Sequence, residues 1–149
     1  MALAVLIDAD NVSACIADGL FATIGALGRI GLRRMYGDFR EARLKPWTVA
    51  AARHRIRRRQ APRIGSNASD FALYLDADAL LRGRTFDGFC LVSSDGDFAA
   101  LAAHIRNAGA AAYGFGEAKT PASLRNACTR FFRTEPMRAG AARKFMQPA

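Results

Sequence analysis

The chain has 149 residues, 22 of them basic and 13 acidic, and a formal net charge of +9. This length, with a hydrophobic content of 51%, fits one domain with one core and excludes two domains of ordinary size. The apolar run at residues 2–7 is short, follows no basic region and ends at an acid, so we expect neither a signal peptide nor a membrane span, and a cytoplasmic protein.

Apolar runs of strand length alternate with segments of helical periodicity, which predicts a mainly parallel sheet covered by helices on both faces. In chain order we expect a strand at residues 3–7, a helix at 13–27, a strand at 33–38, a helix at 46–53, a strand at 56–60, a helix at 69–81, a strand at 89–93, a helix at 98–107, a strand at 111–116, a short helix after Thr120 and an edge strand at 129–134. The domain is expected to cover residues 1–135, and residues 136–149 to form a basic, flexible tail.

Positive charge is concentrated between Arg29 and Arg63, where twelve basic residues face two acidic ones. Six arginines of this segment are predicted to bind RNA: Arg53, Arg55, Arg57, Arg58, Arg59 and Arg63. A dense basic patch suits a polyanion because each neutralised phosphate releases counterions. The alternative is a solvated basic face without a ligand.

Six aspartates follow the expected strands or open a helix beside them: Asp8, Asp10, Asp38, Asp70, Asp95 and Asp97. In a doubly wound sheet, ligands bind outside the carboxyl ends of the strands, so we expect these side chains to converge at one edge. Two carboxylates ~4 Å apart repel by about 4 kcal/mol at an effective dielectric near 20, which favours a cation between them. Because the candidate ligands are hard oxygens, Mg²⁺ or Mn²⁺ is the expected metal cofactor.

We expect Asp8, Asp70 and Asp95 to hold the metal, and Asp97 to bind a second ion or to position water. Asn11 and Ser94 are expected to fix the ligands in place. Asp10 and Asp38 are weaker candidates, and for Asp10 an alternative is that it ties down its own loop.

The motifs IDADNVS, RRMYGDF, NASDFALYLDADALL, DGFCLVSSDGDF and AAYGFGEAKTPASLRNACTRFF occur in this order. Together they resemble the NYN domain, a PIN-like nuclease fold, and within it the bacterial LabA-like branch. The resemblance extends to about Thr134. It implies a Rossmann-like α/β/α sandwich and a metal-dependent ribonuclease whose acidic site falls on Asp8, Asp70, Asp95 and Asp97.

The chain departs from that family in two places. Ile64, Gly65 and Ser66 stand where relatives often carry Lys-Gly-Lys, and we do not expect the helical RNA-binding module of longer relatives. Selection of RNA is therefore expected to come from the basic patch, from a homodimer or from a separate RNA-binding partner, and DNA stays open as a substrate.

Two other functions remain open. The stretch DADNV from Asp8 to Val12 also fits the nucleophile motif of haloacid-dehalogenase-like phosphatases, in which Asp8 would attack phosphorus, Asp10 would act as acid and base, and Lys119 would be the lysine. The second alternative is an RNA-binding or regulatory module without turnover.

Overall fold

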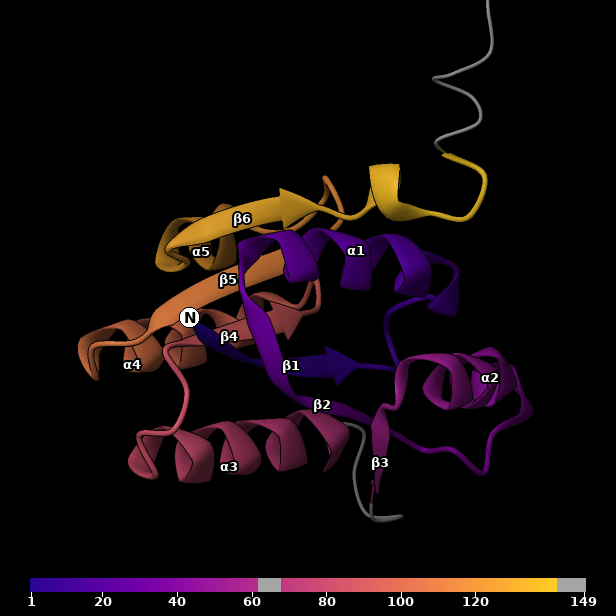
Figure 1. Cartoon of the computed structure of the whole chain (residues 1–149), viewed down its shortest axis with the longest axis horizontal. Helices are drawn as coiled ribbons and strands as arrows, with labels where there is room; N and C mark the ends of the chain where they lie inside the picture. Colours follow the sequence, from indigo (N-terminus) through magenta and orange to yellow (C-terminus); the bar gives the residue numbers. More distant parts are fainter. Residues whose placement is uncertain (62–67, 142–149) are drawn as a thin grey trace, which may run out of the picture.

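Six strands form one sheet in the computed structural model, which describes residues 1–61 and 68–141. They are β1 (Ala2–Asp8), β2 (Arg29–Gly37), β3 (Arg57–Gln60), β4 (Gly88–Val92), β5 (Ala111–Gly116) and β6 (Arg130–Arg133). Their order in space is β3-β2-β1-β4-β5-β6, and every neighbouring pair is parallel (Figure 1). The predicted parallel sheet is confirmed.

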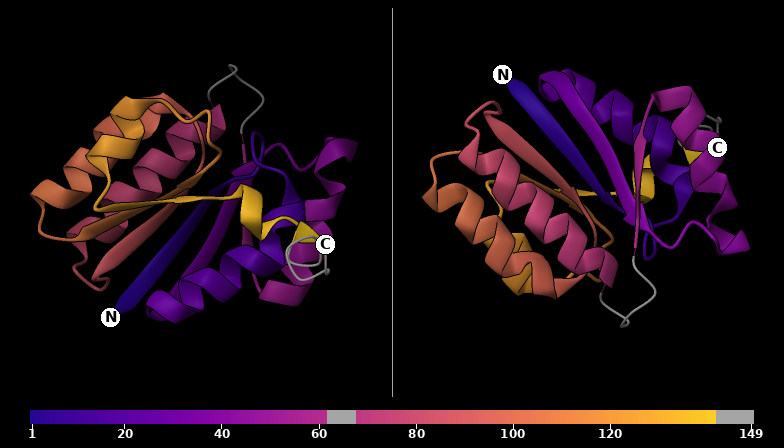
Figure 2. Two further views of the ribbon diagram at one scale, coloured as in Figure 1. Left: turned by 90° about the horizontal axis from the view of Figure 1, so that it is seen from above. Right: turned by 90° about the horizontal axis from the view of Figure 1, so that it is seen from below.

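Helices cover both faces of the sheet, as Figure 2 shows from two sides. One face carries α1 (Ala17–Leu27) and α2 (Lys45–His54), and the other carries α3 (Ala68–Arg82), α4 (Ala99–Asn107) and α5 (Ala122–Ala127). Strand β1 is buried on both sides: Leu3, Val5 and Ile7 pack towards α1 and α2, and the intervening Ala4 and Leu6 towards α3 and α4. The continuous apolar run follows from this burial of both faces. The three-layer α/β/α sandwich is therefore as expected.

Two elements differ from the sequence prediction by more than one residue. Strand β2 begins at Arg29 rather than near residue 33, because its backbone pairs with β1 from Ala2 onward although the side chains there are only partly buried. The helix expected at 13–27 is divided into a 3-10 turn, η1 (Ala14–Ile16), and α1. The Ser13 side chain accepts a hydrogen bond from the backbone N–H of Cys15 and so caps the turn.

The first residues of the expected flexible tail are packed against the domain. A 3-10 turn, η4 (Glu135–Met137), lies on α1, and Met137 packs against the core on that side. The backbone N–H of Ala139 donates to the carbonyl of Cys15 at 2.8 Å. A Cβ added to Gly19 would lie 2.5 Å from the Met137 carbonyl oxygen, so the absent side chain makes room for this contact. Residues 142–149 lie outside the described part of the chain.

The strand order reverses direction between β1 and β4. The chain leaves β1 towards α1 on one face, and it leaves β4 towards α4 on the other face. The connections therefore part at the carboxyl ends of these two strands, and in open α/β sheets ligands bind at such a point. Within the described residues, no helix is long and apolar enough to cross a membrane.

Candidate active site

Asp8 is a fully buried carboxylate at the end of β1. Ser93 donates a hydrogen bond to Asp8 Oδ2 at 2.8 Å, and the amide nitrogen of Asn11 lies 3.2 Å from both carboxylate oxygens. Burial raises the pKa of Asp8, and the hydrogen bonds from Ser93 and Asn11 oppose that rise. These neutral donors orient the carboxylate, but none neutralises its charge. Asp8 and Asn11 thus lie at the expected edge.

Asp70, Asp95 and Asp97 lie at the same edge. Asp70 is in the first turn of α3, and Asp95 caps the 3-10 turn η3 (Gly96–Phe98) by accepting a hydrogen bond from the N–H of Asp97 at 2.9 Å. Burial raises the pKa of Asp70 to about 7, and the neighbouring carboxyl groups of Asp8 and Asp95 add to the rise. The structure therefore brings the expected acids into mutual electrostatic contact.

The four acids differ from most other aspartates because no basic side chain of the described chain lies within ion-pair distance of them. Ion pairs with arginine or histidine are instead made by Asp10, Asp18, Asp38, Asp76 and Asp78. Four anionic groups without a counter-charge, all with oxygen donors, fit a hard divalent cation. However, no three acidic, histidine or cysteine side chains of the described segments lie close enough together to coordinate one metal ion. The chemistry of the oxygen donors fits a divalent cation, but the positions of these side chains do not form a complete coordination site.

The two serines after β4 have different contacts. Ser93 is buried, donates to Asp8 and accepts a hydrogen bond from the N–H of Asp95 at 3.1 Å, so it links two of the acids. Ser94, the serine expected to support the ligands, accepts a hydrogen bond from the N–H of Glu117 at 2.8 Å and joins the ends of β4 and β5. Sequence reasoning missed Ser93. The register of β1 and β4 identifies Ser93: Ile7 pairs with Val92, so the residues that follow them, Asp8 and Ser93, lie side by side.

Asp10 and Asp38 are engaged with loops. Asp10 accepts a hydrogen bond from the N–H of Asp38 at 2.9 Å and lies 3.6 Å from Arg43, so it ties the loop after β1 to the loop after β2. A hydrogen bond from Arg40 holds the pKa of Asp38 far below its usual range, and one from Gln60 adds to this effect. These contacts match the alternative in which Asp10 fixes its loop.

The expected RNA-binding arginines within the described residues lie at the end of α2 and on β3. Strand β3 is fully exposed and carries Arg57, Arg58 and Arg59 towards the carboxyl edge of the sheet. Two of the six arginines are paired with acids, Arg53 with Asp18 at 2.7 Å and Arg59 with Asp76 at 2.8 Å. Arg63 lies outside the described residues. The arginines that face solvent without a described acidic partner are therefore Arg55, Arg57 and Arg58.

Comparison with known proteins agrees with this architecture. The model of the NYN domain matches residues 2–135. No curated protein matches the chain. Among solved structures, the chain is similar to a protein of unknown function from Vibrio parahaemolyticus, with 17% identity, coverage of 92% of this chain and 94% of that chain, and a TM-score of 0.78. At this identity the likeness concerns the fold alone. Since the family match spans nearly all of the described domain, the chain belongs to the NYN domain family and has its PIN-like fold.

Proposed function

We propose that this NYN domain is a metal-dependent ribonuclease that hydrolyses RNA phosphodiester bonds at the edge formed by Asp8, Asp70, Asp95 and Asp97. NYN domains are typically nucleases, which supports hydrolysis of nucleic acid as the general activity. The observation that carries the proposal is the group of four acids with no described basic partner at the switch point of the sheet.

Each residue has a distinct part in the proposed reaction. Asp8, Asp70 and Asp95 would hold Mg²⁺ or Mn²⁺, which when bound supplies an activated water and stabilises the leaving oxygen. Ser93 and Asn11 hold the Asp8 carboxylate in its orientation. Asp97 is exposed beside this group, where it can accept a proton from water or position it.

Binding of RNA is proposed for the exposed side chains of β3 together with an aromatic residue. Arg57 and Arg58 point out from the edge strand and carry no described ion pair. Phe71 follows Asp70 directly, and 66% of its surface is exposed, which is unusual for a phenylalanine. Exposed aromatic rings bind single-stranded nucleic acid by base stacking, and basic side chains contribute by neutralising phosphates. A single-stranded substrate is therefore proposed, and membership of the LabA-like branch is part of the same proposal.

The test is incubation of the purified protein with labelled RNA and labelled DNA, with Mn²⁺ or with EDTA. Cleavage of RNA that requires the metal and is lost in Asp95→Asn is the expected result. A matched control is Asp87→Asn, because Asp87 precedes β4 whereas Asp95 follows it, and both changes remove one negative charge. Full activity of Asp95→Asn, or no cleavage by the wild-type chain, would contradict the proposal.

The alternatives are separated by the same experiment. Binding of RNA without any cleavage would favour the regulatory module. Activity on a small phosphomonoester alone would favour the phosphatase, but the engagement of Asp10 with Asp38 and Arg43 leaves it poorly placed to act as the acid and base. Lys119, the lysine that the phosphatase would use, is exposed, and its Nζ atom lies 3.7 Å from Oε1 of Glu117.

A further inference from the structure

In the described part of the chain, half of strand β2 has no partner strand on its outer side. Strand β1 pairs with β2 along its whole length, from Ala2 opposite Arg29 to Asp8 opposite Tyr36. Strand β3 pairs only with the second half, from Arg34 to Gly37. No other described backbone group hydrogen-bonds to the outer side of residues 29–33. The N–H and C=O groups of this half-strand therefore form an open edge about 16 Å long at roughly 3.3 Å per residue.

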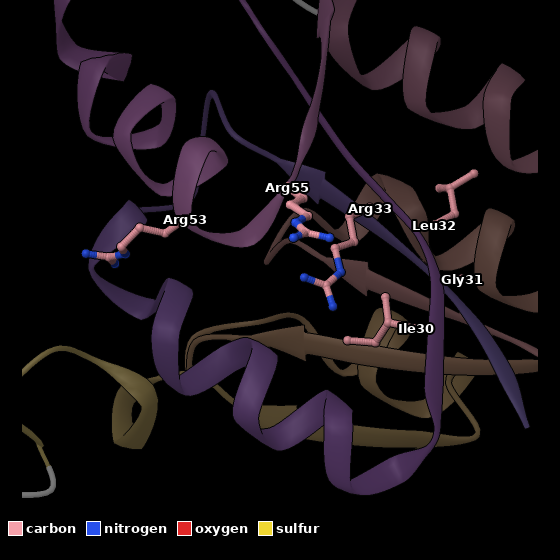
Figure 3. A pocket seen from close by; sticks show the side chains of 6 residues that line it. All are labelled: Ile30, Gly31, Leu32, Arg33, Arg53 and Arg55. Atoms are coloured by element: carbon pink, nitrogen blue, oxygen red, sulfur yellow. The ribbon is translucent and has the colours of Figure 1, made fainter.

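A basic groove runs beside the open edge. It is a hollow of about 460 Å³ lined by Ile30, Gly31, Leu32, Arg33, Arg53 and Arg55. Figure 3 shows the side chains of Arg33 and Arg55 directed into the same space between β2 and the end of α2. Arg33 is held in place, because it donates to the carbonyl oxygen of His54 at 2.7 Å and lies over the ring of Phe21. The groove is thus a formed surface whose walls carry positive charge.

Arg55, which lines this groove, has an unusual backbone conformation. It occupies the left-handed conformation, with φ of 56°, at the end of α2, where glycine is usual. A side chain there is strained, because its Cβ atom crowds the neighbouring carbonyl oxygen. In the described segments no acid pairs with its guanidinium. The side chain is therefore present at a backbone position that disfavours it, and no ion pair in the described segments accounts for its charge.

The groove lies away from the carboxylates. Arg33 pairs with Val5, three residues before Asp8, which places it about 10 Å down the strand from the site. Ile30 pairs with Leu3 and lies further still. A ligand here need not take part in the proposed cleavage.

We propose that the open edge of β2 at residues 29–33 binds an extended acidic segment of a partner protein, which adds as a strand to the sheet. An extended polypeptide backbone offers donors and acceptors at the regular spacing that an open strand edge presents. Acidic side chains on that segment would face the arginines of the groove, which gives charge complementarity. A second copy of this chain is disfavoured, since both copies would bring the same arginines to the contact. This inference is independent of the proposed nuclease activity.

The probe is a labelled, extended peptide of alternating valine and glutamate, and its binding to the full chain is followed by fluorescence anisotropy and amide hydrogen exchange. We expect binding together with slower exchange at residues 30–33. The same peptide with every backbone nitrogen methylated keeps its charge but has no N–H group on either edge to pair with a strand, so it should not bind.

The variant Arg55→Gly should weaken peptide binding about three- to fivefold without loss of stability, because glycine suits the left-handed position. Arg84→Gly is the matched control: Arg84 is also a left-handed arginine, with φ of 52°, but does not line the groove. Equal binding of the methylated peptide, equal effects of the two variants, or no binding at all would overturn the inference. Weaker binding of single-stranded RNA, rather than of the peptide, in Arg55→Gly would assign the groove to nucleic acid instead.

Discussion

Replacing Asp95 with asparagine should stabilise the metal-free protein while it abolishes cleavage. Asparagine keeps the cap on the N–H of Asp97, so local structure is preserved. The substitution removes the charge of a carboxyl group that helps to raise the pKa of Asp70. Two charges ~4 Å apart repel by about 4 kcal/mol at an effective dielectric near 20. Because both side chains are only partly buried, solvent screening reduces the expected gain in unfolding free energy to about 1 to 2 kcal/mol.

The gain should depend on pH in a defined direction. The pKa of Asp70 is raised from 3.8 to about 7, so the folded protein binds more protons than the unfolded chain between these values. Metal-free wild-type protein therefore loses stability as pH rises from about 4 through 7, and the benefit of Asp95→Asn should be larger near pH 8 than near pH 5.

Urea unfolding in EDTA at both pH values measures this effect, and Asp87→Asn is the control for loss of one exposed charge. Addition of Mn²⁺ should raise the midpoint of the wild type and leave that of Asp95→Asn unchanged. A variant less stable than the wild type near pH 8 would refute the reasoning, because the acids would then not repel one another in the folded state.

Three further substitutions test separate contacts. Ser93→Ala should slow cleavage and lower the unfolding free energy by about 2 kcal/mol, because a hydrogen bond to the buried Asp8 carboxylate is lost. Ser94→Ala should leave the cleavage rate unchanged, because Ser94 bonds to Glu117 instead. Equal effects of the two variants on the cleavage rate would argue against a role for Ser93. Asp76→Ala should lower the unfolding free energy by about 3 kcal/mol, since it leaves two guanidinium groups and a buried phenol without their shared acceptor; a loss below about 1 kcal/mol in urea unfolding would contradict this. Gly19→Ala should displace Met137, and limited proteolysis should then cut near residue 137 faster than in the wild type; unchanged cutting would show that the contact is dispensable.

The sequence alone was sufficient to predict the order and type of the elements. Strand β1 is recognisable because burial on both faces demands an uninterrupted apolar run, and β5 was expected at the residues where it occurs. The positions of Asp8 and Asp95 after apolar strands predicted that they would meet, since parallel strands end at a common edge. Strand identity and the residues that follow each strand depend on short stretches of the chain, so short sequence patterns predict them.

Only the tertiary structure decided which neighbouring polar residue serves the site. Ser93 and Ser94 are adjacent serines that the sequence does not distinguish, and the register between β1 and β4 places Ser93 against Asp8. The same holds for Asp10, whose partners lie in the loop after β2. Strand register and loop contacts join residues far apart in the chain, and their energies depend on neighbours that no local pattern specifies. The open edge of β2 has the same origin, because it exists only where β3 stops pairing.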